Sequence, residues 1–146
     1  MYIVSACLLG VNCRYDGQNN YNEKIYKLFK KYKLFPVCPE VLGGMEIPRN
    51  PCEIKIIDNK EKVFDINGNE RTNEFQIGAR KVLDIAKLIN IDGAILMDRS
   101  PSCGVNKIYD GTFNNNLITG MGITTKLLKE NGFKVYATSD LDNLFK

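Results

Sequence analysis

The sequence predicts an α/β domain with a mostly parallel β-sheet. Short apolar runs alternate along the chain with stretches of helical periodicity, which is typical of parallel strands joined by right-handed crossovers. Two further runs, residues 54–57 and 62–66, flank a short polar turn and predict a β-hairpin outside the main sheet. The strands predicted for the main sheet are residues 2–6, 34–37, 93–97 and 133–137.

The first predicted helix begins at Asn22, a residue suited to the N-cap, and runs to about Lys33. Its lysines fall mostly outside the apolar face, and we interpret them as a solvated helix face rather than a nucleic-acid patch. The apolar face comprises Ile25, Leu28, Phe29 and Tyr32, and the lysines are Lys24, Lys27, Lys30 and Lys31.

The longest predicted helix begins at Thr72 or Asn73 and runs to about Asn90. Asn73 and Gln76 have the spacing of a capping box. A last helix is expected from residue 124 or 125, ending at the Asn-Gly pair 131–132. The apolar stripe of the longest helix comprises Phe75, Ala79, Val82, Leu83, Ala86, Leu88 and Ile89.

The length of 146 residues predicts one domain spanning residues 1–146. Apolar residues make up 44% and charged residues 25% of the chain, as in ordinary globular proteins. The net charge of +3 is too small to indicate free nucleic acid as a partner. Because the sequence has neither a run of about 20 apolar residues nor a signal-peptide pattern, we expect a cytoplasmic protein that does not bind a membrane.

The cysteines carry the most specific functional information. Cys7, Cys38 and Cys103 each lie just past the carboxyl end of a predicted strand, in segments that contain Gly or Pro. Ligands of open α/β sheets bind at this edge, so we expect the three thiols to meet in one crevice and hold a metal centre. Cys13 and Cys52 lack this placement and are weaker ligand candidates. Each cysteine taken alone is also compatible with a small buried apolar residue.

The five cysteines and the absence of histidine restrict the chemistry. Without a secretion signal, the cysteines are expected to be reduced thiols or metal ligands rather than disulfides. The absence of histidine excludes Cys-His and Ser-His nucleophile pairs and imidazole-bearing zinc sites. Three thiolates suit a soft metal or an iron–sulfur cluster, and a [4Fe–4S] cluster with three protein ligands leaves one iron open as a Lewis acid.

Five motifs occur in order along residues 3 to about 137. They are Ser5-Ala6-Cys7-Leu8-Leu9-Gly10, Arg14-Tyr15-Asp16-Gly17, Pro36-Val37-Cys38-Pro39-Glu40, Arg99-Ser100-Pro101-Ser102-Cys103-Gly104 and Tyr109-Asp110-Gly111-Thr112-Phe113. Together they resemble a bacterial family whose characterised members are thiouracil desulfidases. The resemblance implies a Rossmann-like single domain and a [4Fe–4S] cluster held by Cys7, Cys38 and Cys103.

The same resemblance implies the reaction. Members of this type remove sulfur from 2-thiouracil and related thiolated pyrimidines and release hydrogen sulfide. The open iron is thought to bind the substrate sulfur as a transient [4Fe–5S] species without net redox change. Relatives with an extra fused domain act on thiolated tRNA, and a chain of this length favours a free small substrate.

That chemistry requires a base for the attacking water and hydrogen-bonding groups for the pyrimidine. Glu40, two residues past Cys38, is the first candidate for the base or proton shuttle, and a helix or loop cap is its alternative role. Ser100 and Ser102 are candidates for hydrogen bonds to the cluster or substrate, or they satisfy the turn. Weaker candidates are Asp16, Asp98 and Arg99, expected in turns or local salt bridges, and Tyr15 and Tyr109, which can stack on the pyrimidine or pack in the core.

Two other functions remain open at the level of sequence. The first is a thiol-based redox or sulfur-transfer protein without a cluster, with Cys7 or Cys13 as the nucleophile. No histidine or adjacent lysine is evident to lower the pKa of these thiols, which counts against it. The second is a non-enzymatic iron–sulfur or metal-binding module, which would more often use four protein ligands.

Overall fold

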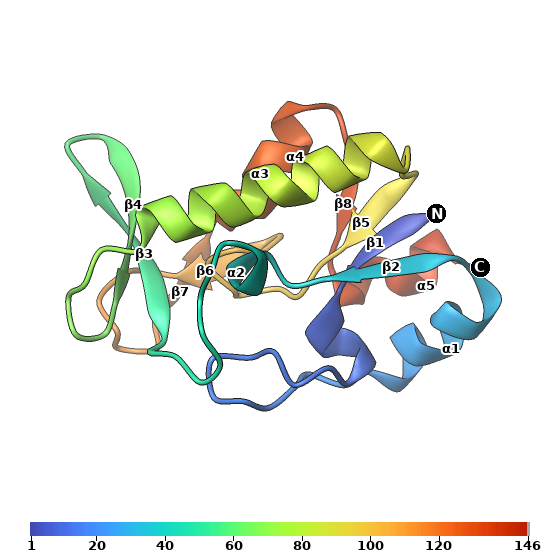
Figure 1. The fold of residues 1–146 in the computed structure, drawn as a ribbon, viewed down its shortest axis with the longest axis horizontal. Helices are drawn as coiled ribbons and strands as arrows, with labels where there is room; N and C mark the ends of the chain where they lie inside the picture. The colour runs from blue at the N-terminus through green and yellow to red at the C-terminus, as the bar shows by residue number, and fades with distance from the viewer. Residues whose placement is uncertain (146) are drawn as a thin grey trace.

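The computed structural model describes residues 1–145, in which a four-stranded parallel sheet forms the centre of the fold (Figure 1). The strand order is β2-β1-β5-β8, so the first strand lies between the second and the fifth. Every adjacent pair is parallel, as the sequence predicts. The strands are β1 (Tyr2–Ser5), β2 (Leu34–Val37), β5 (Gly93–Ile95) and β8 (Val135–Tyr136), all but β2 shorter than predicted.

Helices cover both faces of this sheet. Successive side chains of a strand point to opposite faces, so Ile3 and Val4 of β1 enter two different apolar clusters. Ile3 packs with residues of α3 (Thr72–Leu88) and α4 (Ile123–Glu130), whereas Val4 packs with residues of α1 (Glu23–Lys31) and α5 (Leu141–Leu144). None of the helices in residues 1–145 is long and apolar enough to cross a membrane.

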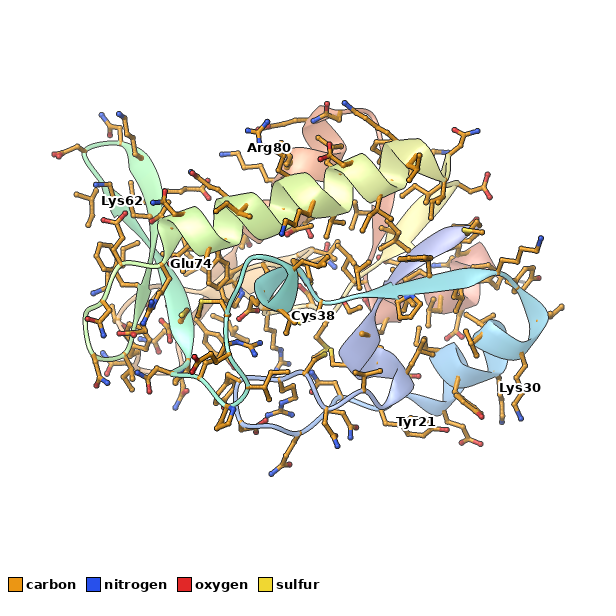
Figure 2. All side chains as sticks on the ribbon, in the orientation of Figure 1. Tyr21, Lys30, Cys38, Lys62, Glu74 and Arg80 are labelled. Carbon is orange, nitrogen blue, oxygen red and sulfur yellow. The ribbon has the colours of Figure 1, made fainter. Side chains whose placement is uncertain are left out.

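The first predicted helix is confirmed as α1. The Asn22 side chain accepts hydrogen bonds from the backbone N–H groups of Lys24 and Ile25 at 3.0 and 3.3 Å, as an N-cap does. The four lysines of the helix are exposed, and Figure 2 shows Lys30 on the outer side of α1. Phe29, predicted on the apolar face, is 45% exposed, and its ring stacks with the exposed ring of Tyr26 at 6.5 Å between centroids.

The longest predicted helix is confirmed as α3, but the capping box proposed for Asn73 and Gln76 is wrong. The helix begins at Thr72 with Arg71 in the N-cap position. The Thr72 hydroxyl accepts the backbone N–H of Val63 at 3.0 Å, which ties the helix start to the neighbouring hairpin. Phe75, Ala79, Val82, Leu83 and Ala86 of the predicted stripe are buried, whereas Leu88, the last helical residue, is exposed.

Two antiparallel hairpins extend the fold beyond the parallel sheet. The predicted hairpin is formed by β3 (Cys52–Ile57) and β4 (Lys60–Asp65), and α3 reaches from this hairpin to the parallel sheet (Figure 1). The second hairpin, β6 (Lys107–Tyr109) and β7 (Leu117–Thr119), was not predicted. Both contribute to a third apolar cluster, which contains Cys52, Ile54, Val63, Phe75 and Ile108.

A one-turn helix, α2 (Pro39–Leu42), lies against α3 at a glycine-glycine contact. A side chain at Gly43 would collide with the carbonyl oxygen of Glu74, and a side chain at Gly78 would collide with the carbonyl oxygen of Pro39. Neither position has room for a Cβ atom, so the two glycines set how closely α2 approaches α3. The remaining short elements are 3₁₀ turns at η1 (Ala6–Leu9) and η2 (Thr138–Asp140).

Candidate active site

Three loops at the carboxyl edge of the parallel sheet, together with residues of the two hairpins, line one cavity of about 510 Å³. Cys7 lies in η1 directly after β1, Cys38 is the N-cap of α2 directly after β2, and Cys103 lies in the loop after β5. Figure 2 shows Cys38 where the chain passes from β2 into α2. Because β1 lies between β2 and β5, the structure brings these three cysteines from separate parts of the chain to the same cavity wall.

Cys13 also reaches this cavity, from the loop that follows η1. Its buried thiol hydrogen-bonds with the thiols of both Cys7 and Cys38. The hydrogen bond between Cys13 and Cys7 is the main cause of the lowered pKa of Cys7. The Asn20 amide lowers this pKa further, because its Nδ2 donates to Cys7 Sγ at 3.4 Å. The structure therefore places Cys13 beside the cysteines that the strand-end rule selects.

The thiols differ in their ease of ionisation. The hydrogen bond with Cys13 lowers the pKa of Cys38 to about 7, although burial opposes this. The same two hydrogen bonds and burial raise the pKa of Cys13. Burial raises the pKa of Cys103 to about 12, against hydrogen bonds with Ser5 and Ser102. Because a thiolate is the form that binds metal, Cys7 and Cys38 are the thiols of this group that are best prepared to act as ligands.

The donor set fits an iron–sulfur cluster. Within residues 1–145, no group of three or more cysteine or carboxylate side chains converges on one point as a single metal ion requires. A cluster binds each thiolate at a different iron, so its ligands can stand further apart. Soft sulfur donors from Cys7, Cys38 and Cys103 on one cavity wall match that requirement.

Glu40, Ser100 and Ser102 form a continuous hydrogen-bonded chain beside Cys103. Ser102 Oγ donates to Glu40 Oε2 at 2.9 Å, and the Ser100 and Ser102 hydroxyl oxygens are also 2.9 Å apart. Ser102 Oγ lies 3.6 Å from Cys103 Sγ. The structure thus brings together Glu40, the predicted base or proton shuttle, and the two serines predicted to hydrogen-bond the cluster or substrate. The Glu40 side chain bonds to Ser102 rather than to a helix end.

Arg49 completes this chain and was not identified from the sequence. Its Nε donates to Glu40 Oε1 at 3.2 Å, with side chains only 6% and 15% exposed respectively. Its other nitrogens donate to the carbonyl oxygens of Cys13 at 2.9 Å and Glu46 at 3.1 Å. The guanidinium therefore fixes the Glu40 carboxylate and ties it to the loop that carries Cys13. The irregular, Pro-containing segment around Arg49 was the only sequence signal.

The loop that carries Cys103 is organised by Asp98. Its Oδ1 accepts the backbone N–H groups of Val105, Asn106 and Lys107 at 2.9, 3.0 and 3.1 Å. Burial alone would raise the pKa of Asp98, but these backbone hydrogen bonds together hold it below its ordinary value. Asp98 thus has the turn-forming role that the sequence predicts for it.

The weaker candidates have peripheral positions. Asp16 pairs with Arg14 at 2.9 Å and accepts the backbone N–H of Gln18, so it forms a local salt bridge and turn. Arg99 is exposed, lines the cavity and has a left-handed backbone with φ of 71°. Tyr15, which is 42% exposed, and Tyr109 also line the cavity.

Glu53 is a further acidic residue in the cavity wall that the sequence reasoning missed. Its side chain is buried, and its Oε1 accepts the backbone N–H groups of Gly111 and Phe113 at 3.0 and 3.1 Å. This contact gives the Tyr-Asp-Gly-Thr-Phe motif its place, because the carboxylate holds the motif against β3. An acidic residue in an otherwise apolar strand start was the available signal.

Comparison with known proteins agrees with this geometry. A family model described as 2-thiouracil desulfurase matches residues 2–140. The Bacillus subtilis (strain 168) protein YbbK is 41% identical over 150 residues, which covers 99% of each chain. The solved structure of the [4Fe-4S]-dependent thiouracil desulfidase TudS is similar with a TM-score of 0.89 and 38% identity, covering 98% of this chain and 93% of that one. The chain belongs to the 2-thiouracil desulfurase family.

Proposed function

We propose that this protein is a [4Fe–4S]-dependent desulfidase that converts 2-thiouracil, or a related thiolated pyrimidine, into the oxygen analogue and hydrogen sulfide. The observation that carries the proposal is the placement of three strand-end cysteines in one cavity beside the Glu40–Ser102 hydrogen bond. Family membership and the similarity to TudS support the same reaction class.

Cys7, Cys38 and Cys103 are the proposed ligands of the cluster. Held by these three residues, a bound cluster would supply one open iron as a Lewis acid for the sulfur of a thiocarbonyl group. Cys13 is left out of the proposed set because the family motifs place the ligands at Cys7, Cys38 and Cys103, and its thiol hydrogen-bonds with two of these. Cys52 is excluded because it begins β3 in the hairpin rather than following a strand of the parallel sheet, and its Sγ donates to the Asn50 carbonyl oxygen at 3.6 Å.

The residues around the proposed ligands supply the proton transfers. Water adds to the carbon of the C=S group, the carbon–sulfur bond breaks, and the sulfur leaves as hydrogen sulfide with no change in oxidation state. Glu40 Oε2 takes a proton from the attacking water through the Ser102 hydroxyl and returns it to the leaving sulfur. Arg49 holds the opposite oxygen of Glu40, so the carboxylate keeps Oε2 directed to Ser102.

The cavity wall offers planar apolar contacts for a pyrimidine. Tyr109, Phe113 and Pro101 line the cavity on the side of the second hairpin and the Cys103 loop. An aromatic heterocycle stacks favourably on such surfaces, which would hold the ring of the substrate in the cavity.

A thiol-based redox or sulfur-transfer function is the alternative, and the lowered pKa of Cys38 supports it. A thiol with a pKa of about 7 is about half ionised near neutral pH, so a nucleophilic thiolate is available. Cys13, one of the nucleophiles suggested by the sequence, does not fit this role because its pKa is raised.

Iron counting in single Cys→Ser variants separates these functions. The chain is reconstituted with iron and sulfide without oxygen, and iron per chain and sulfide released from 2-thiouracil are measured on the same samples. We expect about four irons per chain, lost in the Cys7→Ser, Cys38→Ser and Cys103→Ser variants and kept in Cys13→Ser and Cys52→Ser. Sulfide release should follow the iron content.

Two results would contradict the proposal. If the wild-type chain takes up no iron, the cluster is excluded and the thiol-based function becomes the explanation. Iron uptake with no release of sulfide from any thiolated pyrimidine would show a cluster protein with a different reaction.

A further inference from the structure

We propose that Glu53 is a substrate-binding residue whose carboxylate accepts a hydrogen bond from a pyrimidine N–H group next to the carbon–sulfur bond. This inference rests on the proposed function, since it concerns how the same cavity recognises its substrate. Glu53 is neither a proposed cluster ligand nor part of the proposed proton path.

The position of Glu53 in β3 directs its side chain to the cavity. Successive residues of a strand point to opposite faces, and its neighbours Cys52 and Ile54 both pack in the apolar cluster under α3. Glu53 therefore faces the other way, toward the loop at Gly111 to Phe113 and the cavity that it lines. The side chain is only 8% exposed, so the carboxylate lies inside the protein rather than on its surface.

One oxygen of the carboxylate is held by the protein. Oε1 accepts two backbone N–H groups, from residues 58 and 60 positions further along the chain. The loop is pressed tightly on β3, since a Cβ at Gly111 would lie 2.6 Å from the carbonyl oxygen of Ile54. With Oε1 fixed by two donors on a closely packed loop, the carboxylate has a defined orientation.

The second oxygen has no partner in the protein. Within residues 1–145, Glu53 forms no salt bridge, and no side chain or backbone group donates a hydrogen bond to Oε2. In this part of the chain, the fully buried side-chain nitrogen and oxygen atoms that lack a hydrogen-bond partner are Arg71 Nε and Thr124 Oγ1. Glu53 Oε2 lacks a partner but is not one of these buried atoms, so it is accessible. Oε2 is therefore open to the cavity, where a bound molecule can reach it.

The chemistry of this oxygen selects its ligand. A carboxylate oxygen in an apolar surrounding costs free energy unless it receives a hydrogen bond, and its preferred partner is an N–H or O–H donor. The N1–H and N3–H groups of 2-thiouracil both flank the C2–S bond, and either can donate to Oε2 while the sulfur faces the thiols. A fixed acceptor of this kind would recognise the pyrimidine edge and set the position of the reacting carbon.

The Glu53→Gln variant gives a sharp test because the protein dictates the orientation of the new amide. Only the amide oxygen can accept the N–H groups of Gly111 and Phe113, so the amide NH₂ must face the cavity. The substitution therefore replaces an acceptor by a donor at the substrate, with almost no change of shape. Glu61→Gln is the matched control, since Glu61 lies on β4 and pairs with Lys126 outside the cavity.

The measurements are the dissociation constants of 2-thiouracil, 1-methyl-2-thiouracil and 3-methyl-2-thiouracil, by calorimetry on the reconstituted protein, together with kcat and KM for sulfide release. We expect one methyl compound to bind wild type about 10- to 100-fold more weakly than 2-thiouracil, the loss expected for a hydrogen bond to a charged group. Glu53→Gln should weaken the binding of 2-thiouracil by a similar factor and raise its KM more than it lowers kcat. The binding of that methyl compound should be the same in Glu53→Gln as in wild type. Iron content and the Glu61→Gln variant should match wild type.

Other results overturn the inference in distinguishable ways. Equal binding of all three compounds to wild type, or equal losses for all three in Glu53→Gln, would remove Glu53 from substrate recognition while sulfide release still supports the proposed function. Binding with the expected N–H dependence but no sulfide release would support Glu53 and overturn the proposed function. No binding of any compound to wild type would overturn both.

Discussion

Ser102 donates its hydroxyl hydrogen to Glu40 Oε2 across 2.9 Å, although 62 residues separate the two along the chain. If both residues act in one proton path, removing either interrupts the same step. We expect Ser102→Ala and Glu40→Gln each to lower kcat for sulfide release by about 10²- to 10⁴-fold, and the double variant to be little worse than the poorer single one. Single-turnover sulfide release at matched iron content measures this.

Ser139→Ala, an exposed serine in η2, is the control for the hydroxyl loss. Losses that multiply in the double variant would show that Ser102 and Glu40 act independently.

Arg49 is expected to contribute strongly to stability because it pairs with Glu40 away from water. Arg49→Met leaves a largely buried carboxylate without its cation, and we expect the free energy of unfolding to fall by about 3–5 kcal/mol. Arg49→Lys keeps the charge but lacks the forked geometry that reaches the carbonyls of Cys13 and Glu46, so it should recover only part of the loss.

Urea unfolding of metal-free chains without oxygen gives these values. Lys27→Met is the matched control, since its salt bridge with Glu23 is about 70% exposed on both sides and should contribute less than about 1 kcal/mol. Equal effects of Arg49→Met and Lys27→Met would contradict the importance of the buried pair.

Asp98 predicts a specific dependence of stability on pH. Its folded-state pKa lies below the unfolded value of about 3.9, so its contribution is fully present above that value and is lost as the pH falls through the folded-state pKa. We expect Asp98→Asn to lower the free energy of unfolding by about 1–3 kcal/mol at pH 7, because backbone donors lose a charged acceptor. The difference from wild type should shrink at pH 3.

Urea titrations at both pH values test this, with Asp84→Asn on the exposed side of α3 as the control. A difference from wild type that is the same at pH 3 and pH 7 would mean that the Asp98 charge is not what holds the loop.

Gly78 is expected to reverse the usual effect of alanine in a helix. Replacing a helical glycine by alanine normally stabilises by about 0.5–1 kcal/mol. At Gly78 the added Cβ would collide with the Pro39 carbonyl, so we expect a loss of about 1–3 kcal/mol and lower iron occupancy as α2 and Cys38 are displaced. Thermal unfolding and iron counting measure both effects.

Ile77→Ala, at an exposed position of the same helix, controls for a general effect of substitution in α3. A stabilised Gly78→Ala variant with full iron content would show that α2 can move away from α3 without consequence.

Sequence reasoning succeeded where function follows from local pattern and strand polarity. The period of the apolar residues identified the parallel strands and α1, and Asn22 marked the start of that helix. Because Cys7 and Cys38 directly follow their strands, the rule that strand ends share an edge placed them in one cavity with Cys103.

Sequence reasoning failed where a contact joins distant segments or where an element is very short. The strands of the β6–β7 hairpin have three residues each, too few to show a period. The Thr72 hydroxyl bonds to Val63 in a neighbouring strand, which no capping pattern reveals. The roles of Arg49 and Glu53 depend on hydrogen bonds to residues that lie 36 to 60 positions away along the chain, at Cys13, Gly111 and Phe113.

The cysteine loops are held in place by groups other than thiols. Asp98 fixes the Cys103 loop, the glycine contact fixes α2 behind Cys38, and the backbone N–H of Asn20 donates to the Cys7 carbonyl at 2.9 Å. We therefore expect the pocket to form without iron, unlike small zinc domains whose folding depends on the metal. Iron supply should then set what fraction of the chains is active, while the number of chains that survive in the cell stays the same.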